Sequence, residues 1–104
     1  MKNINNKKIN IYIGLTTNED KPLNLKNTLK VISNLFIKNG ITGFNINRIM
    51  GFWNKTQEKA LIVSFINTYN LKYSLLKEII IKLRDDLKQD AVLLEVLNIP
   101  FEFI

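Results

Sequence analysis

The 104-residue chain contains no histidine and no cysteine, so few of its side chains are suited to chemistry. Histidine is the commonest general base and metal ligand, and a cysteine thiolate is a ready nucleophile. Only Asp, Glu, Lys and Tyr remain as acids or bases, which disfavours an enzyme. We therefore expect no catalytic residue, no metal site and no cofactor.

The candidate binding residues gather around a polar turn at 54–59, between two apolar stretches. Arg48 and a lysine would hold a phosphate, and Trp53 would stack on a base. This predicts a site for a small anionic ligand such as a nucleotide. The candidate ligand residues are Arg48, Trp53, Lys55, Glu58, Lys59 and Tyr12. In the structural alternative, Arg48 pairs with Glu58 across a hairpin and Trp53 packs at the edge of the core.

The elements that must position these residues form two β-α-β halves. Alternating apolar residues predict strands over 9–16, 43–53, 60–66 and 91–97, and helical periodicity predicts helices over 23–38 and 71–88. This order is typical of the ferredoxin-like βαββαβ fold of the α+β class. Right-handed crossovers then give a four-stranded antiparallel sheet of order 4-1-3-2, with both helices on one face. We expect residues 1–8 to be a flexible basic lead-in, residues 9–104 a single domain, and 101–104 a short terminal extension.

The third strand, 60–66, is apolar on both faces, although one face of such a sheet should be polar in a lone monomer. We expect the open face to be an oligomer interface, since burying each such side chain contributes roughly 1.5–3 kcal/mol. The expected interface residues are Ile49, Ile62, Ile66, Leu93, Leu97, Phe101 and Phe103. In the alternative, the tail "IPFEFI" folds back over its own sheet.

The net charge of +6 favours anionic partners, although a composition rich in Lys, Asn and Ile also fits an AT-rich coding sequence. The central strands lack the paired aromatic residues of sheet-surface RNA readers, so we expect no nucleic-acid partner. No run of about eighteen apolar residues is present, and the polar start does not resemble a signal peptide. We therefore expect a cytoplasmic protein without a membrane partner.

The stretches "GFNINRIMGFW" and "EKALIVSFI", which follow the strand "IYIGL", resemble the small ferredoxin-like domains of the PII and CutA group. The matching positions are Phe44, Gly51, Trp53 and Glu58. The resemblance implies a homotrimer packed through its sheet faces, with nucleotide sites in clefts between subunits. The chain departs from PII proteins in its short polar turn, and from CutA proteins in lacking His and Cys. Regulation through a long loop and metal binding are therefore not implied.

The sequence thus predicts a non-enzymatic homo-oligomer that binds a small anionic ligand between subunits, as a sensor or as a sponge that sequesters it. Such a small protein would suit a phage or mobile element. One alternative is a basic interaction module or inhibitor that docks on an acidic protein surface. The least favoured is a small enzyme that uses Tyr12, Glu58 or Lys59 as acid or base, for which turnover dependent on Glu58 would be the evidence.

Overall fold

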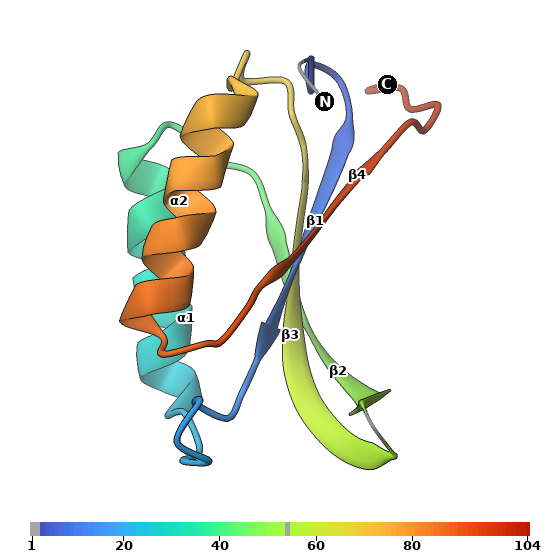
Figure 1. Ribbon diagram of the computed structural model, residues 1–104. Helices are drawn as coiled ribbons and strands as arrows, with labels where there is room; N and C mark the ends of the chain where they lie inside the picture. Colours follow the sequence, from blue (N-terminus) through green and yellow to red (C-terminus); the bar gives the residue numbers. More distant parts are fainter. Residues whose placement is uncertain (1–2, 54) are drawn as a thin grey trace.

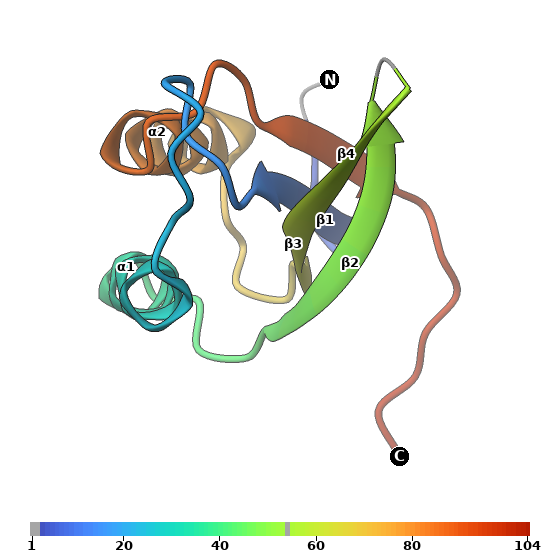
Figure 2. The same ribbon diagram turned by 90° about the horizontal axis from the view of Figure 1, so that it is seen from below.

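The computed structural model describes residues 3–53 and 55–104 and contains one antiparallel sheet and two helices. The elements are β1 (Lys8–Gly14), α1 (Leu25–Lys38), β2 (Asn45–Trp53), β3 (Thr56–Ile66), α2 (Tyr73–Asp86) and β4 (Leu93–Leu97). The strand order is β2-β3-β1-β4, and Figures 1 and 2 show both helices on the same face of the sheet. The ferredoxin-like prediction is confirmed, strand order included.

The core fills the space between the sheet and the helices. Alternate residues of β1 point into it, and Ile9, Ile11 and Ile13 are fully buried. From α1, Phe36 meets the ring of Phe65 edge-on, with 5.7 Å between the ring centroids. Because side chains alternate along a strand, the other residues of β1 and β3 lie on the open face, where no helix covers them.

Polar residues fix where α1 begins and ends. The side chain of Asn24 accepts a hydrogen bond from the backbone N–H of Asn27 at 2.9 Å, so it caps the helix N-terminus. At the other end, Gly40 takes a left-handed conformation with φ of 81° and donates to the carbonyl of Ile37.

The β2–β3 hairpin is longer than the sequence predicts. The polar residues at 56–59 belong to β3, and Thr56 pairs directly with Trp53. The left-handed φ of 64° at Lys55 lets the chain reverse within a very short connection. The hairpin therefore extends beyond the end of β1, which pairs with β3 only as far as Gly14 and Ala60.

The N-terminal turn is attached to the core, although we expected residues 1–8 to be loose. Ile4 is only 1% exposed. The buried amide of Asn67 donates to the carbonyls of Ile4 and Leu71, at 3.0 Å each, and accepts from the N–H of Leu71 at 3.1 Å. One side chain thus joins the first turn to the loop between β3 and α2.

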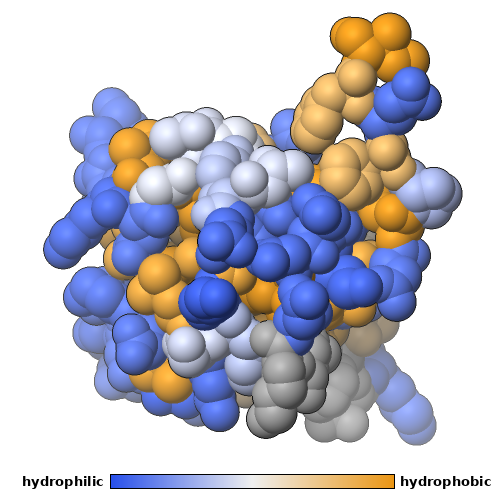
Figure 3. All heavy atoms as spheres, turned by 90° about the horizontal axis from the view of Figure 1, so that it is seen from above, coloured by the Kyte–Doolittle hydropathy of each residue, from blue (hydrophilic) through white to orange (hydrophobic). Residues whose placement is uncertain are grey.

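The segment after β4 leaves the body of the domain (Figure 2), and a largely hydrophobic segment projects from the surface in Figure 3. Within the tail the rings of Phe101 and Phe103 meet edge-on, and Phe103 is 77% exposed. The tail does not cover its own sheet, which was the alternative to self-association. Neither helix in the described part of the chain has the length and apolar character that a bilayer span requires.

Candidate functional site

A hollow of about 790 Å³ opens where β1 ends on the open face of the sheet. β1 contributes Tyr12 and Gly14, and β3 contributes Glu58 and Ala60. The loop after β1 and the chain from Gln89 to the first residue of β4 complete its wall with Thr16, Thr17, Asn18, Asp20, Gln89, Asp90, Ala91, Val92 and Leu93. Polar side chains from four separate segments therefore converge on one concave surface.

Gly14 lets two of these side chains come together over the end of β1. A Cβ atom at this position would lie 2.9 Å from Glu58 Oε1 and 2.9 Å from Gln89 Oε1. The carboxyl oxygen of Glu58 and the amide oxygen of Gln89 thus occupy the space that the side chain of any larger residue at position 14 would fill. Gln89 is held there by its Nε2 group, which donates to the carbonyls of Thr16 at 3.2 Å and Leu87 at 3.1 Å.

Glu58 is a carboxylate without a cationic partner among the described residues. The ion pairs among those residues are formed by Glu19, Asp85 and Asp86 instead, all at exposed positions. On β2, the residue paired with Glu58 is Gly51, which has no side chain to contact the carboxylate. A half-buried carboxylate in this setting can attract a cationic group of a ligand or accept a proton from it.

A row of polar side chains continues from Tyr12 across the open face. Ser64 donates to Asn10 at 2.8 Å, and the amide of Asn10, only 6% exposed, reaches Glu95 at 3.4 Å. Hydrogen bonding to the Glu95 carboxylate, followed by burial and the charge of that group, raises the pKa of Tyr12 above 10.0. Tyr12 is therefore neutral near pH 7 and serves as a hydrogen-bond donor or an aromatic surface rather than as a base.

A second hollow, of about 740 Å³, lies against the part of the hairpin that extends beyond β1. Arg48 and Lys59 line it, above a floor that includes Leu15, Leu23 and Leu25. Arg48 faces Leu61 in the register, whereas Glu58 faces Gly51, so these two side chains leave opposite sides of the sheet. The alternative prediction, that Arg48 pairs with Glu58 across the hairpin, is therefore wrong.

The structure divides the six candidate ligand residues. Tyr12 and Glu58 both line the first hollow, Glu58 also lines the second, and Arg48 and Lys59 line the second. Lys55 is exposed in the connection between β2 and β3 and lines neither hollow. Trp53 ends β2, but its side chain lies outside the described part of the structure.

The expected interface residues also divide into two groups. Ile49, Ile62 and Ile66 share the open face with Leu93 and Leu97, as the register of β1 with its neighbours requires. Of these, Leu93 is 58% exposed and Leu97 37%. The other two, Phe101 and Phe103, lie on the projecting tail instead.

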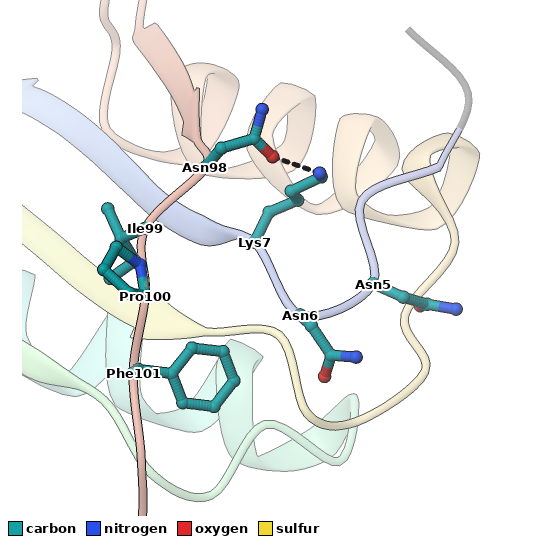
Figure 4. A pocket seen from close by; sticks show the side chains of 7 residues that line it. All are labelled: Asn5, Asn6, Lys7, Asn98, Ile99, Pro100 and Phe101. Carbon is teal, nitrogen blue, oxygen red and sulfur yellow. Dashed lines mark hydrogen bonds between the residues drawn. The ribbon is translucent and has the colours of Figure 1, made fainter.

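A third hollow, of about 490 Å³, lies between the N-terminal turn and the tail (Figure 4). Lys7 donates to the side-chain oxygen of Asn98 there, and the ring of Phe101 forms one wall. Its walls are mostly asparagine amides and aliphatic groups, and it holds no carboxylate. It therefore offers less chemistry than the hollow that contains Glu58.

Sequence reasoning missed Gly14 and Gln89. Gly14 stands in an alternating strand pattern where a glycine has no visible purpose, and Gln89 follows a helix more than seventy residues later. The only signal was the glycine itself, because a glycine inside a strand often marks a close approach of other groups.

Comparison with known proteins yields solved structures with the same fold. A phage SAM lyase in complex with S-methyl-5'-thioadenosine matches with a TM-score of 0.63 and 17% identity, over 88% of this chain and 81% of that chain. A phage SAM lyase in its apo state matches with a TM-score of 0.60 and 21% identity, over 92% and 84%. No protein-family model matches the chain, and no curated protein matches it in sequence.

These matches show the fold, and they correct the expected class of function. We expected a non-enzymatic ligand-binding protein or an interaction module, whereas both of these solved structures are of a phage SAM lyase. The expectation failed because it equated a lack of His and Cys with a lack of chemistry. The resemblance to the PII and CutA group stays a prediction.

Proposed function

We propose that the protein is an enzyme that cleaves S-adenosylmethionine (SAM) and releases S-methyl-5'-thioadenosine. The observation that carries the proposal is Glu58, a carboxylate without a described cationic partner, in a hollow of about 790 Å³ beside neutral Tyr12. The fold shared with a phage SAM lyase supports it, and it also supports a phage origin.

The substrate and product define the bond that breaks. S-Methyl-5'-thioadenosine keeps the adenosyl and methyl groups, so the bond between sulfur and the γ-carbon of the methionine part is cleaved and its electrons stay on sulfur. Without water, the four-carbon fragment balances in one of two ways. It loses a proton from the β-carbon to a base, or its own carboxylate attacks the γ-carbon and closes a lactone. Only the first route needs a base, and Glu58, the half-buried carboxylate of the hollow, is our candidate.

The hollow suits a sulfonium ion. The charge of Glu58, supplemented by Asp20 and Asp90 at the rim, favours a cation, and the face of Tyr12 offers a further favourable surface. The amide of Gln89 and the loop hydroxyls of Thr16 and Thr17 offer donors and acceptors to a nucleoside. The positive charge of the ligand is the reverse of the anionic ligand that the sequence suggested.

The test is release of S-methyl-5'-thioadenosine from SAM, followed by liquid chromatography with mass detection. We expect turnover by the wild type and a loss of about 100-fold or more in kcat/KM for Glu58→Gln, which removes the charge and keeps the shape. Glu78→Gln, at an exposed position of α2, is the matched control and should keep wild-type activity. A wild type that forms no thioether product, or a Glu58→Gln variant as active as the control, would overturn the proposal.

We also propose that copies of the chain associate through the open face, as a cytoplasmic homotrimer. The support is the apolar surface of Leu93, Leu97 and Ile62 on the open face, where the hollow has its mouth and where Leu93 lines it. A second copy would cover that mouth and exclude water from the site. Native mass spectrometry tests this directly, because a monomer at micromolar concentration contradicts it.

A further inference from the structure

The two hollows at the hairpin are neighbours. Thr16, Asp20 and Glu58 line both of them, so Glu58 stands where the hollow on the open face adjoins the space beside Arg48. A ligand longer than a nucleoside can therefore occupy one hollow with one end and the second with the other.

The second hollow has a cationic wall. Arg48 and Lys59 are near neighbours on the same side of the hairpin, since Arg48 pairs with Leu61 and Lys59 with Met50. Neither forms an ion pair within 4.0 Å in the described part of the chain, and both are exposed. Two unpaired like charges repel each other, so an anionic group between them would be stabilised by both.

We propose that Arg48 and Lys59 bind the carboxylate of the amino-acid part of the substrate. The inference rests on the proposed cleavage of SAM. The charges of that molecule occur in the order required, because its sulfonium lies between the nucleoside and an amino acid that ends in a carboxylate. With the sulfonium beside Glu58, the carboxylate lies toward the cationic wall, and Asp20, shared by both hollows, lies near the ammonium group.

This arrangement makes Arg48 and Lys59 specificity-determining residues rather than groups that act on the bond. They would select SAM over related sulfonium compounds and over the product, S-methyl-5'-thioadenosine, which has no carboxylate. Loss of the amino-acid part on cleavage would also remove the contacts with the second hollow, which favours release of the product.

The test compares three ligands on the wild type and on the double variant Arg48→Gln/Lys59→Gln. The KM for SAM should rise about tenfold or more in the variant, since charge-assisted hydrogen bonds are among the strongest polar contacts. The inhibition constants for decarboxylated SAM and for S-methyl-5'-thioadenosine should stay within about twofold, because neither ligand has the carboxylate. Lys38→Gln/Lys72→Gln removes the same charge at exposed positions, at the end of α1 and just before α2, and should behave as wild type.

Each result has a distinct meaning. Equal weakening of all three ligands would contradict the carboxylate contact and indicate a general effect on the hairpin. An unchanged KM for SAM would contradict it as well, while turnover by the same preparation would leave the proposed lyase activity intact. A wild type that forms no S-methyl-5'-thioadenosine would instead overturn the proposed function, and the carboxylate assignment with it.

Discussion

The substitution Gly14→Ala separates the geometry of the site from the stability of the fold. The added Cβ would lie 2.9 Å from both Glu58 Oε1 and Gln89 Oε1, inside ordinary van der Waals contact. Both atoms end flexible side chains, so the backbone does not have to move. Replacing Gly by Ala in a strand contributes about 0.5–1 kcal/mol to stability. Disturbing the hydrogen bonds of Gln89 costs about 1 kcal/mol, so the net change in the free energy of unfolding should be within about 1 kcal/mol.

The effect on activity should be much larger. Glu58 has to leave its position over the end of β1, and a misplacement of about 1 Å at an active site can cost about 100-fold in rate. We expect kcat/KM for SAM to fall between about tenfold and 100-fold. The measurements are thermal unfolding together with the chromatographic assay of S-methyl-5'-thioadenosine.

Gly51→Ala is the matched control. Gly51 lies opposite Glu58 on the same face of the sheet, and an added Cβ there meets nothing within 4 Å. This variant should keep its activity and gain a few tenths of a kcal/mol in stability. Full activity in Gly14→Ala, or equal losses in both variants, would refute the argument that the crowding over Gly14 positions Glu58.

Two further predictions concern Asn67, which joins the N-terminal turn to the loop after β3, and Tyr12, which lines the first hollow. Asn67→Ala leaves three buried backbone groups without their partner and should reduce the free energy of unfolding by about 3 kcal/mol in urea titrations, whereas Asn34→Ala, on the exposed side of α1, should change it by less than about 0.5 kcal/mol. The folded state raises the pKa of Tyr12 above 10.0, so the unfolded chain loses this proton first and stability falls as the pH rises past about 10. Tyr12→Phe should remove that part of the decline. The measurement is the free energy of unfolding of both proteins from about pH 8 to about pH 11. A difference between them that does not change with pH would contradict the shift in the pKa of Tyr12.

The fold was predictable because its signals are local. Alternation in β1 and the helical stripe around Ile32 and Phe36 each fix which side of an element is buried, and Asn24 and Gly40 mark the ends of α1. Two β-α-β halves with short connections then leave few topologies. The length of the hairpin was not predictable in this way, because residues 56–59 are polar on both faces and resemble a turn until they are seen to pair with β2.

The site was predictable only in part. Tyr12 and Glu58 were identified as candidates, yet no pattern in the sequence indicates that they share one hollow or that Arg48 lies on the other side of the sheet. The separation depends on the register, since a shift of one residue between β2 and β3 would reverse the side of the sheet that each residue occupies. Gln89 reaches the site through tertiary packing and two backbone carbonyls, which no spacing in the sequence records.

The class of function was misjudged for a chemical reason that the proposed reaction makes plain. General acids and bases are needed when a leaving group departs as an anion or a nucleophile must lose a proton. A sulfonium leaves as a neutral thioether and needs no acid, and the one proton lost in the elimination, from the β-carbon, needs only a carboxylate such as Glu58 to accept it. For such a substrate the protein has only to orient the reacting atoms and surround the charge with suitable groups. Glu58, Tyr12 and the cationic pair Arg48 and Lys59 are of that kind, so a chain without His or Cys still has the side chains that this reaction requires.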